Sequence, residues 1–162
     1  MNTYFKSPIL WDYFLITIIN ILLCVLVNQN ILLIPNDDYN LSMTSDISNI
    51  GFTSAGFVLT FLTLLITFKS STTTNKETGD ETDTLFNLFL ATGLYDETIK
   101  HLKNAVKSLI FMAIIGYSFK LLLNPTHQYL TYYFNISGVF LTAITLWRCL
   151  IILTKILKMQ KE

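Results

Sequence analysis

Four long apolar segments constrain the fold of this chain more than any other feature of its sequence. They cover about residues 8–28, 47–68, 105–123 and 129–148, and most of their side chains are Leu, Ile, Phe or Val. A hydrocarbon core of about 30 Å is crossed by about 20 helical residues at roughly 1.5 Å each, so each segment has the length of one span. The segments lack the alternating polarity that the strands of a membrane β-barrel require. The sequence therefore predicts an all-α integral membrane protein with four transmembrane helices.

The overall composition agrees with this prediction. Hydrophobic residues make up 52% of the chain and charged residues 14%, and the mean hydropathy is +0.51, which is too apolar for an ordinary soluble domain. A cleaved signal peptide is the alternative for the first segment. That segment is longer than the apolar part of most signal peptides and ends in VNQN, without a small-x-small cleavage site. We therefore expect residues 1–162 to form a single membrane domain that keeps its first span.

The distribution of Lys and Arg predicts the topology, because basic residues near the ends of spans are retained in the cytoplasm. The loop 29–46 has no Lys or Arg, and neither does the turn 124–128. The connector 69–104 and the segment after the fourth span carry Lys69, Lys76, Lys100, Lys103, Arg148, Lys155, Lys158 and Lys161. We therefore expect both termini and the connector to face the cytoplasm.

The connector between spans two and three divides into two parts. Residues 70–82 are small, polar and mixed in charge, which predicts a flexible cytoplasmic link. Residues 83–104 form an amphipathic cytoplasmic helical segment in this interpretation. It comprises a short helix that stops at Gly93 and the first turns of a long helix over 94–123. The short helix is expected to lie on the inner membrane surface or to pack against the ends of the spans.

Three of the four spans carry a stripe of polar or small residues at steps of three and four, which keeps the stripe on one face of a helix. In span two the stripe comprises Asn49, Thr53, Gly56, Thr60, Thr63, Thr67 and Ser70. In span four it comprises Thr131, Asn135, Gly138, Thr142, Thr145 and Cys149, and in span one Tyr13, Thr17, Asn20, Cys24 and Asn28. Membrane helices associate through small residues and side-chain hydrogen bonds, so contact within one bundle or between subunits is one interpretation. The other is that the threonine face of span two lines a water-filled passage shared by several copies.

Few ionisable residues lie at membrane depth, and two of them are expected to pair. Asp12 and Arg148 both fall near the predicted inner boundary, beside Trp11 and Trp147. An ion pair between them would tie the first span to the fourth. Lys120 falls near the outer end of the third span, where its long side chain can reach the interface.

Several functional classes find no support in the sequence. It has no glycine-rich phosphate loop, no HExxH motif, and no Ser or Cys spaced with His and an acid for nucleophilic catalysis. We therefore expect neither enzymatic activity nor a cofactor or metal ion. The spans have no buried pair of carboxylates and no repeat of broken helices, which disfavours a transporter. With 11 basic and 11 acidic residues there is no basic excess for nucleic-acid binding.

Two functional classes remain. The first is a homo-oligomeric membrane effector that forms a pore or disrupts the bilayer, and the second is a membrane subunit that recruits or restrains a cytoplasmic protein through residues 70–104. In size, four spans, inward termini and one amphipathic cytoplasmic excursion, the chain resembles small membrane components of bacterial anti-phage systems, such as the membrane subunit of the Kiwa system. The resemblance lies in layout and carries no site residue over. It implies a homo-oligomer in the bacterial inner membrane that acts in phage defence with a cytoplasmic partner.

Overall fold

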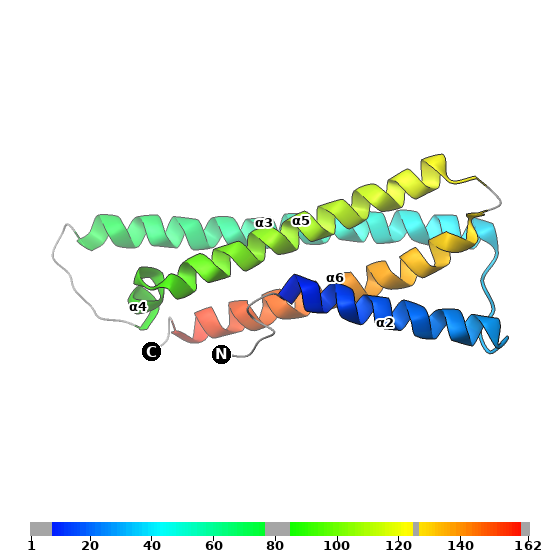
Figure 1. Cartoon of the computed structure of the whole chain (residues 1–162). Coiled ribbons are helices and arrows are strands. Elements are labelled where there is room, and N and C mark those ends of the chain that lie inside the picture. The colour runs from blue at the N-terminus through cyan, green and yellow to red at the C-terminus, as the bar shows by residue number, and fades with distance from the viewer. Residues whose placement is uncertain (1–7, 77–84, 125–126, 160–162) are drawn as a thin grey trace.

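The protein is all-helical in the part of the chain that its structure describes. The computed structural model describes residues 8–76, 85–124 and 127–159, and within them it contains no strand. Its helices are α2 (Pro8–Asn28), α3 (Asp37–Lys76), α4 (Leu85–Ala91), α5 (Gly93–Leu122) and α6 (Tyr129–Met159) (Figure 1). All except α4 are long and apolar enough to cross a membrane. The predictions of an all-α fold and of four potential membrane spans are confirmed.

The four long helices differ in length, and this gives the bundle two unlike ends. α2 has 21 residues, α5 30, α6 31 and α3 40, which correspond to about 32, 45, 46 and 60 Å. Only α2 matches a hydrocarbon core of about 30 Å. The end of α3, the start of α5 and the end of α6 extend beyond the start of α2, at the end that carries α4 (Figure 1). We call this the α4 end of the bundle.

α3 extends beyond the apolar segment 47–68 in both directions. At its start the Asn40 backbone N–H donates to the Asn36 carbonyl at 3.1 Å, and Asp38 places negative charge in the first turn, where the helix dipole favours it. At its other end α3 continues through residues 70–76, where the composition indicated a flexible link. Residues 57–78 contain no Gly or Pro that would stop the helix, and each added residue gains a backbone hydrogen bond. Residues 77–82 of the predicted link lie outside the described residues.

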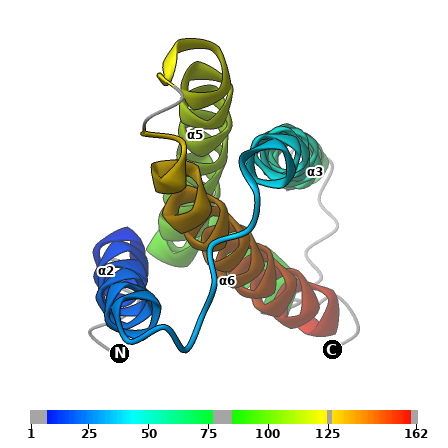
Figure 2. The same cartoon turned by 90° about the vertical axis from the view of Figure 1, so that its right-hand side faces the viewer.

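α6 lies at the centre of the arrangement. Viewed along the bundle, α2 and α3 flank α6 on opposite sides and α5 lies beside both α3 and α6 (Figure 2). α3 packs mainly along α5, whereas α2 packs mainly on α6. Most side chains of α2 are consequently exposed on the surface of the bundle.

Two apolar clusters form the core. At the α4 end, a cluster from α3, α4, α5 and α6 surrounds the fully buried Val58, Leu65, Leu102 and Leu109. Further along, Ile16, Ile47, Met112 and Leu141 bring α2, α3, α5 and α6 together. Apolar packing therefore involves every long helix, although lipid surrounding the bundle would give apolar faces little reason to associate by themselves.

Close helix contact in the second cluster depends on two glycines. A Cβ atom at Gly138 of α6 would lie 2.5 Å from Ile47 Cγ2, and a Cβ atom at Gly116 of α5 would collide with Ser48 Oγ and lie 3.0 Å from Phe134 Cε1. Small residues at these positions allow α3 to approach both neighbouring helices.

Candidate functional site

The stripe predicted in span two lies on the outside of the bundle. Its members Asn49, Thr53, Gly56, Thr60, Thr63, Thr67 and Ser70 are all exposed. We call them the α3 outer stripe. The stripe extends over about 32 Å of helix, which is close to the thickness of the hydrocarbon core. An unbroken line of hydroxyl, amide and glycine positions thus runs along this length of α3.

The opposite side of α3 faces the bundle. Val58 and Leu62 each lie two positions from Thr60, which is about 200° around the helix, and both are buried. The α3 outer stripe is therefore directed away from α5 and α6. Most of the stripe therefore does not serve helix contacts within one chain, and contact between subunits or a shared water-filled passage remain as its interpretations.

The threonine hydroxyls of the stripe are already hydrogen-bonded to their own helix. Each hydroxyl donates to the backbone carbonyl four residues earlier, at 2.9–3.0 Å. The donors are Thr53, Thr60, Thr63 and Thr67. Each hydroxyl oxygen can still accept a bond from water or another donor. The stripe thus tolerates an apolar environment and can also solvate water.

Space is available beside the middle of the stripe. A Cβ atom at Gly56 would meet nothing within 4 Å. Large apolar side chains border the stripe on both sides, among them the exposed Phe57 and Leu64 on one side and Leu59 on the other. The upstream end of the stripe contacts a neighbouring helix, where the Tyr117 hydroxyl of α5 donates to Asn49 Oδ1 at 2.5 Å.

The stripe predicted in span four is buried inside the bundle. The exposed fraction is 1% for both Asn135 and Thr145. Gly138 and Thr142 are also buried. Thr142 donates to the Gly138 carbonyl at 2.6 Å, whereas Thr145 Oγ1 has no hydrogen-bond partner in the described part of the chain. This second stripe is a contact face within one chain.

Asn135 joins α6 to a face of α3 that the sequence analysis missed. Thr44 Oγ1 donates to Asn135 Oδ1 at 2.9 Å, and Asn135 Nδ2 donates to the Asn40 carbonyl at 2.9 Å. Asn40, Thr44 and Ser48 are all buried. They follow one another at steps of four and lie on the side of α3 away from the outer stripe, so α3 carries polar stripes on two sides. The signal was present, but Asn40 and Thr44 fell in what composition marked as a loop.

The polar residues of span one contact α5 and α6. The Tyr13 and Ser108 hydroxyls lie 3.1 Å apart, and Asn20 Nδ2 donates to Ser137 Oγ at 2.7 Å. This stripe therefore also serves contacts within one chain, although Tyr13 remains partly exposed.

Asp12 and Arg148 form an ion pair between α2 and α6. Arg148 Nη1 donates to Asp12 Oδ2 at 2.6 Å, and the side chains are only 7% and 3% exposed. The residues are the two that the sequence paired. Trp11 and Trp147, their chain neighbours, are exposed at the same depth of the bundle, as expected for an aromatic belt at a membrane interface. Lys120, near the end of α5, donates to Ser45 Oγ of α3 at 2.5 Å.

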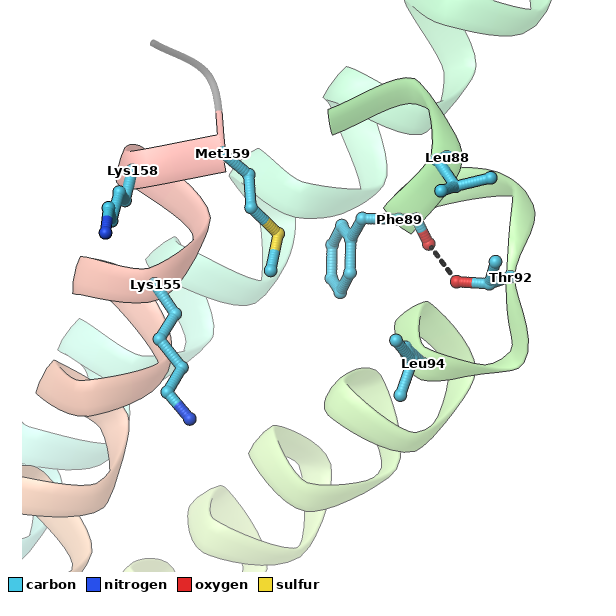
Figure 3. A pocket seen from close by; sticks show the side chains of 7 residues that line it. All are labelled: Leu88, Phe89, Thr92, Leu94, Lys155, Lys158 and Met159. Carbon is cyan, nitrogen blue, oxygen red and sulfur yellow. Dashed lines mark hydrogen bonds between the residues drawn. The ribbon is translucent and has the colours of Figure 1, made fainter. Parts of the chain in front are cut away.

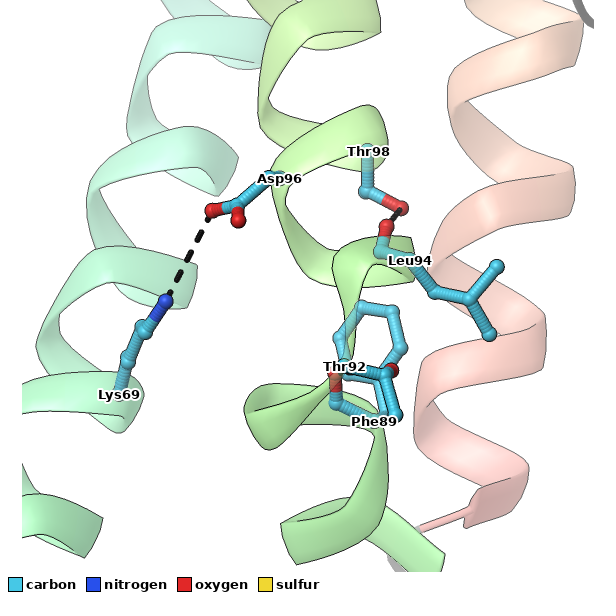
Figure 4. Close-up of polar contacts among 6 residues, drawn as sticks. All are labelled: Lys69, Phe89, Thr92, Leu94, Asp96 and Thr98. Atoms are coloured by element: carbon cyan, nitrogen blue, oxygen red, sulfur yellow. Dashed lines mark hydrogen bonds and ion pairs between the residues drawn. The ribbon is translucent and has the colours of Figure 1, made fainter.

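The short helix α4 packs against the ends of the long helices. Phe86 makes an edge contact with Phe68 of α3, with ring centroids 6.0 Å apart, and Phe89 makes one with Tyr95 of α5 at 6.1 Å. Lys69 lies 3.7 Å from the exposed Asp96 carboxylate (Figure 4). Its ammonium group also lies over the Tyr95 ring. Of the two placements expected for this helix, the structure has the one against the span ends.

The described residues offer no cluster of side chains that could hold a metal ion. No group of three His, Cys, Asp or Glu side chains comes together among them. Cys24 is exposed and Cys149 buried, and both are free thiols. The chemically distinctive features of the described chain are the exposed α3 outer stripe, the buried ion pair and the α4 end.

Comparison with known proteins adds no relative: no family model, no curated protein and no solved structure matches this chain.

Proposed function

We propose that this protein is a non-enzymatic, homo-oligomeric effector of the bacterial inner membrane, in which copies of the chain associate around the α3 outer stripe and enclose a water-filled pore. One observation carries the proposal. The stripes of α2 and α6 make contacts within the chain, whereas the stripe of α3 is exposed along its whole length.

The length of the stripe favours a pore over a simple contact. A helix–helix contact needs small residues only where two helices cross. A passage for water needs polar groups at every depth of the hydrocarbon, and the stripe supplies them over about 32 Å. Its bordering apolar side chains, such as Phe57 and Leu59, would seal neighbouring copies to one another and to lipid.

The chemistry of the stripe limits what such a pore would select. Its polar groups are hydroxyls and one amide, without a charged side chain between Asn49 and Thr67. Rings of charged side chains or backbone carbonyls are the usual means of selecting ions. We therefore propose a weakly selective pore, which would depolarise the membrane that contains it.

The proposed orientation places the α4 end in the cytoplasm. Lys69, Lys100, Lys103, Lys155 and Lys158 lie at that end, whereas Asp38 and Asp46 lie toward the opposite one. This distribution supports inward termini by the positive-inside rule. The resemblance in layout to anti-phage membrane components supports phage defence as the setting in which the effector acts.

Native mass spectrometry in nanodiscs, followed by ion flux into liposomes, tests the proposal. We expect a discrete oligomer and measurable flux. Thr60→Leu with Thr63→Leu should reduce flux about tenfold, because a hydrophobic constriction expels water from a pore. The unfolding midpoint should not change, because both side chains are exposed and hydrogen-bonded only to α3 itself.

Thr17→Leu is the matched control. Thr17 is also exposed at membrane depth and also donates to the carbonyl four residues earlier, at 2.8 Å, but it lies on α2. Flux through the Thr17→Leu variant should stay within about twofold of the wild type, because Thr17 is not part of the α3 outer stripe. A monomer or dimer in nanodiscs, or an equal loss of flux in both variants, would refute a pore built on α3.

A second candidate is a membrane subunit that recruits or restrains a cytoplasmic protein. Leu88 of α4 and Leu94 of α5 are 61% and 50% exposed at the α4 end, which gives a partner an apolar contact. In this case the protein would not conduct, and Leu88→Ser would abolish capture of the partner while Thr60→Leu would leave it unchanged.

A further inference from the structure

A pocket at the α4 end combines an apolar interior with two lysines. Its volume is about 310 Å³, and its apolar walls come from Leu88 and Phe89 of α4, Leu94 of α5 and Met159 of α6. Lys155 and Lys158 of α6 line the same space (Figure 3). An apolar cavity beside two positive charges is complementary to an anionic amphiphile.

The lysines are available to a ligand. Both are exposed, and neither forms an ion pair with any residue that the structure describes. Their spacing of three residues places them on one side of α6. No acidic residue is among the described residues that line the pocket.

The turn between α4 and α5 holds one wall of the pocket in place. The Thr92 hydroxyl donates to the Phe89 carbonyl at 3.0 Å, and the Tyr95 backbone N–H donates to the Thr92 carbonyl at 3.2 Å. The Phe89 ring is buried and makes an edge contact with the Tyr95 ring. It lies beside the Met159 side chain (Figure 3). The pocket is thus part of the folded α4 end, and it exists without a second copy of the chain.

The depth of the pocket matches the lipid headgroups. From Tyr129 to Trp147 α6 rises about 27 Å, close to the thickness of the hydrocarbon core, and both side chains are exposed as in an aromatic belt. Lys155 lies eight residues beyond Trp147, about 12 Å further along the helix. Lysines at this level lie where the phosphates of an anionic membrane surface are found.

We propose that this pocket binds one anionic phospholipid, with its phosphate between Lys155 and Lys158 and the upper part of an acyl chain against Phe89, Leu94 and Met159. The bound lipid would link α4 to the end of α6, which otherwise meet through few side chains. This site goes beyond the proposed pore and does not depend on conduction or on oligomer formation.

Lipid retention measured by native mass spectrometry tests the proposal. The full-length protein is released from nanodiscs of phosphatidylcholine with one fifth phosphatidylglycerol, and the bound lipids are counted at increasing collision energy. We expect one phosphatidylglycerol to remain bound after the others have left. Lys155→Gln with Lys158→Gln should weaken its retention about thirtyfold, roughly fivefold for each lysine.

Lys100→Gln with Lys103→Gln is the matched control, because it removes the same charge from exposed lysines of α5 that do not line the pocket. Leu94→Trp tests the apolar part, because it fills the pocket without changing charge, and it should also lose the retained lipid. Equal effects of the two lysine pairs would overturn the proposal in favour of diffuse attraction to the membrane surface.

Two further arms distinguish the source of the anion. Inorganic phosphate and glycerol phosphate are added at millimolar concentration, and we expect neither to displace the retained lipid. Displacement by free phosphate would overturn the phospholipid assignment in favour of a small soluble anion. Retention unchanged by Leu94→Trp would overturn it in favour of a charge-only contact, such as an acidic peptide.

Discussion

Removing Arg148 should destabilise the bundle more than removing any exposed charge. Arg148 and Asp12 lie 2.6 Å apart with side chains 7% and 3% exposed. Truncating one partner of such a pair leaves the other charge buried without compensation, which costs roughly 3–5 kcal/mol. At about 1.4 kcal/mol for each factor of ten, Arg148→Ala should lower the ratio of folded to unfolded protein by two to four orders of magnitude.

The ion pair between Lys69 and Asp96 provides an internal comparison. Its atoms lie 3.7 Å apart and its side chains are 40% and 77% exposed. Exposed pairs contribute about 0–1 kcal/mol, so Asp96→Asn should change stability by less than about 1 kcal/mol. Burial, more than the presence of an ion pair, therefore sets the expected difference between the two variants.

The measurement is unfolding in mixed micelles with increasing SDS, followed by circular dichroism and by tryptophan fluorescence. Trp11 and Trp147 are the only tryptophans and lie next to the two charged residues in sequence, so fluorescence reports on the pair directly. Asp12→Ala should cost about as much as Arg148→Ala, and the double variant less than the sum of the two. The exchange of Asp12→Arg with Arg148→Asp should recover part of the loss. Additive single costs without recovery in the exchanged variant would refute the pairing argument.

Two further predictions concern packing. Gly116→Ala and Gly138→Ala should each lower the free energy of unfolding by about 1–3 kcal/mol, because a methyl group collides with Ser48 or Ile47, whereas Gly56→Ala should raise it by about 0.5–1 kcal/mol. The same SDS titration measures all three, and a destabilising Gly56→Ala would show that α3 has a neighbour at this position within the chain. Asn135→Ala should cost about 1–3 kcal/mol, because the buried Thr44 hydroxyl loses its bond to Asn135 Oδ1. Thr44→Ala combined with Asn135→Ala should cost less than the sum of the single variants, and strict additivity would contradict the hydrogen bond.

The sequence was sufficient for the membrane spans because their signal is local. Each apolar segment has enough Leu, Ile, Phe and Val to predict insertion without knowledge of its neighbours. The ends of the helices could be predicted less well from the sequence. α3 begins at Asp37 and α6 ends at Met159, since helices continue past the lipid wherever no Gly or Pro stops them. Composition marks where a helix can meet lipid, and it does not mark where the helix stops.

The role of each polar stripe could not be predicted from spacing alone. α3 carries one stripe through Thr60, at alternating steps of four and three, and another through Thr44, at steps of four. Which of them is buried depends on the small residues opposite, Gly116 and Gly138, which lie more than 60 residues away in the sequence. The ion pair could be predicted from the sequence because charges at membrane depth are rare, and Asp12 and Arg148 therefore had few alternative partners.

The position of Arg148 also has a consequence for the order in which the protein is made. Asp12 and Arg148 are separated by 136 positions, so α2 is synthesised well before the helix that carries its ion-pair partner. At about 5–20 residues per second, α2 spends roughly 7–27 s in the cell before Arg148 is synthesised. During that interval the Asp12 carboxylate must remain near water or be held by the insertion machinery. The docking of α6 onto α2 is therefore a later step of biogenesis than the synthesis of α2, and it completes the ion pair.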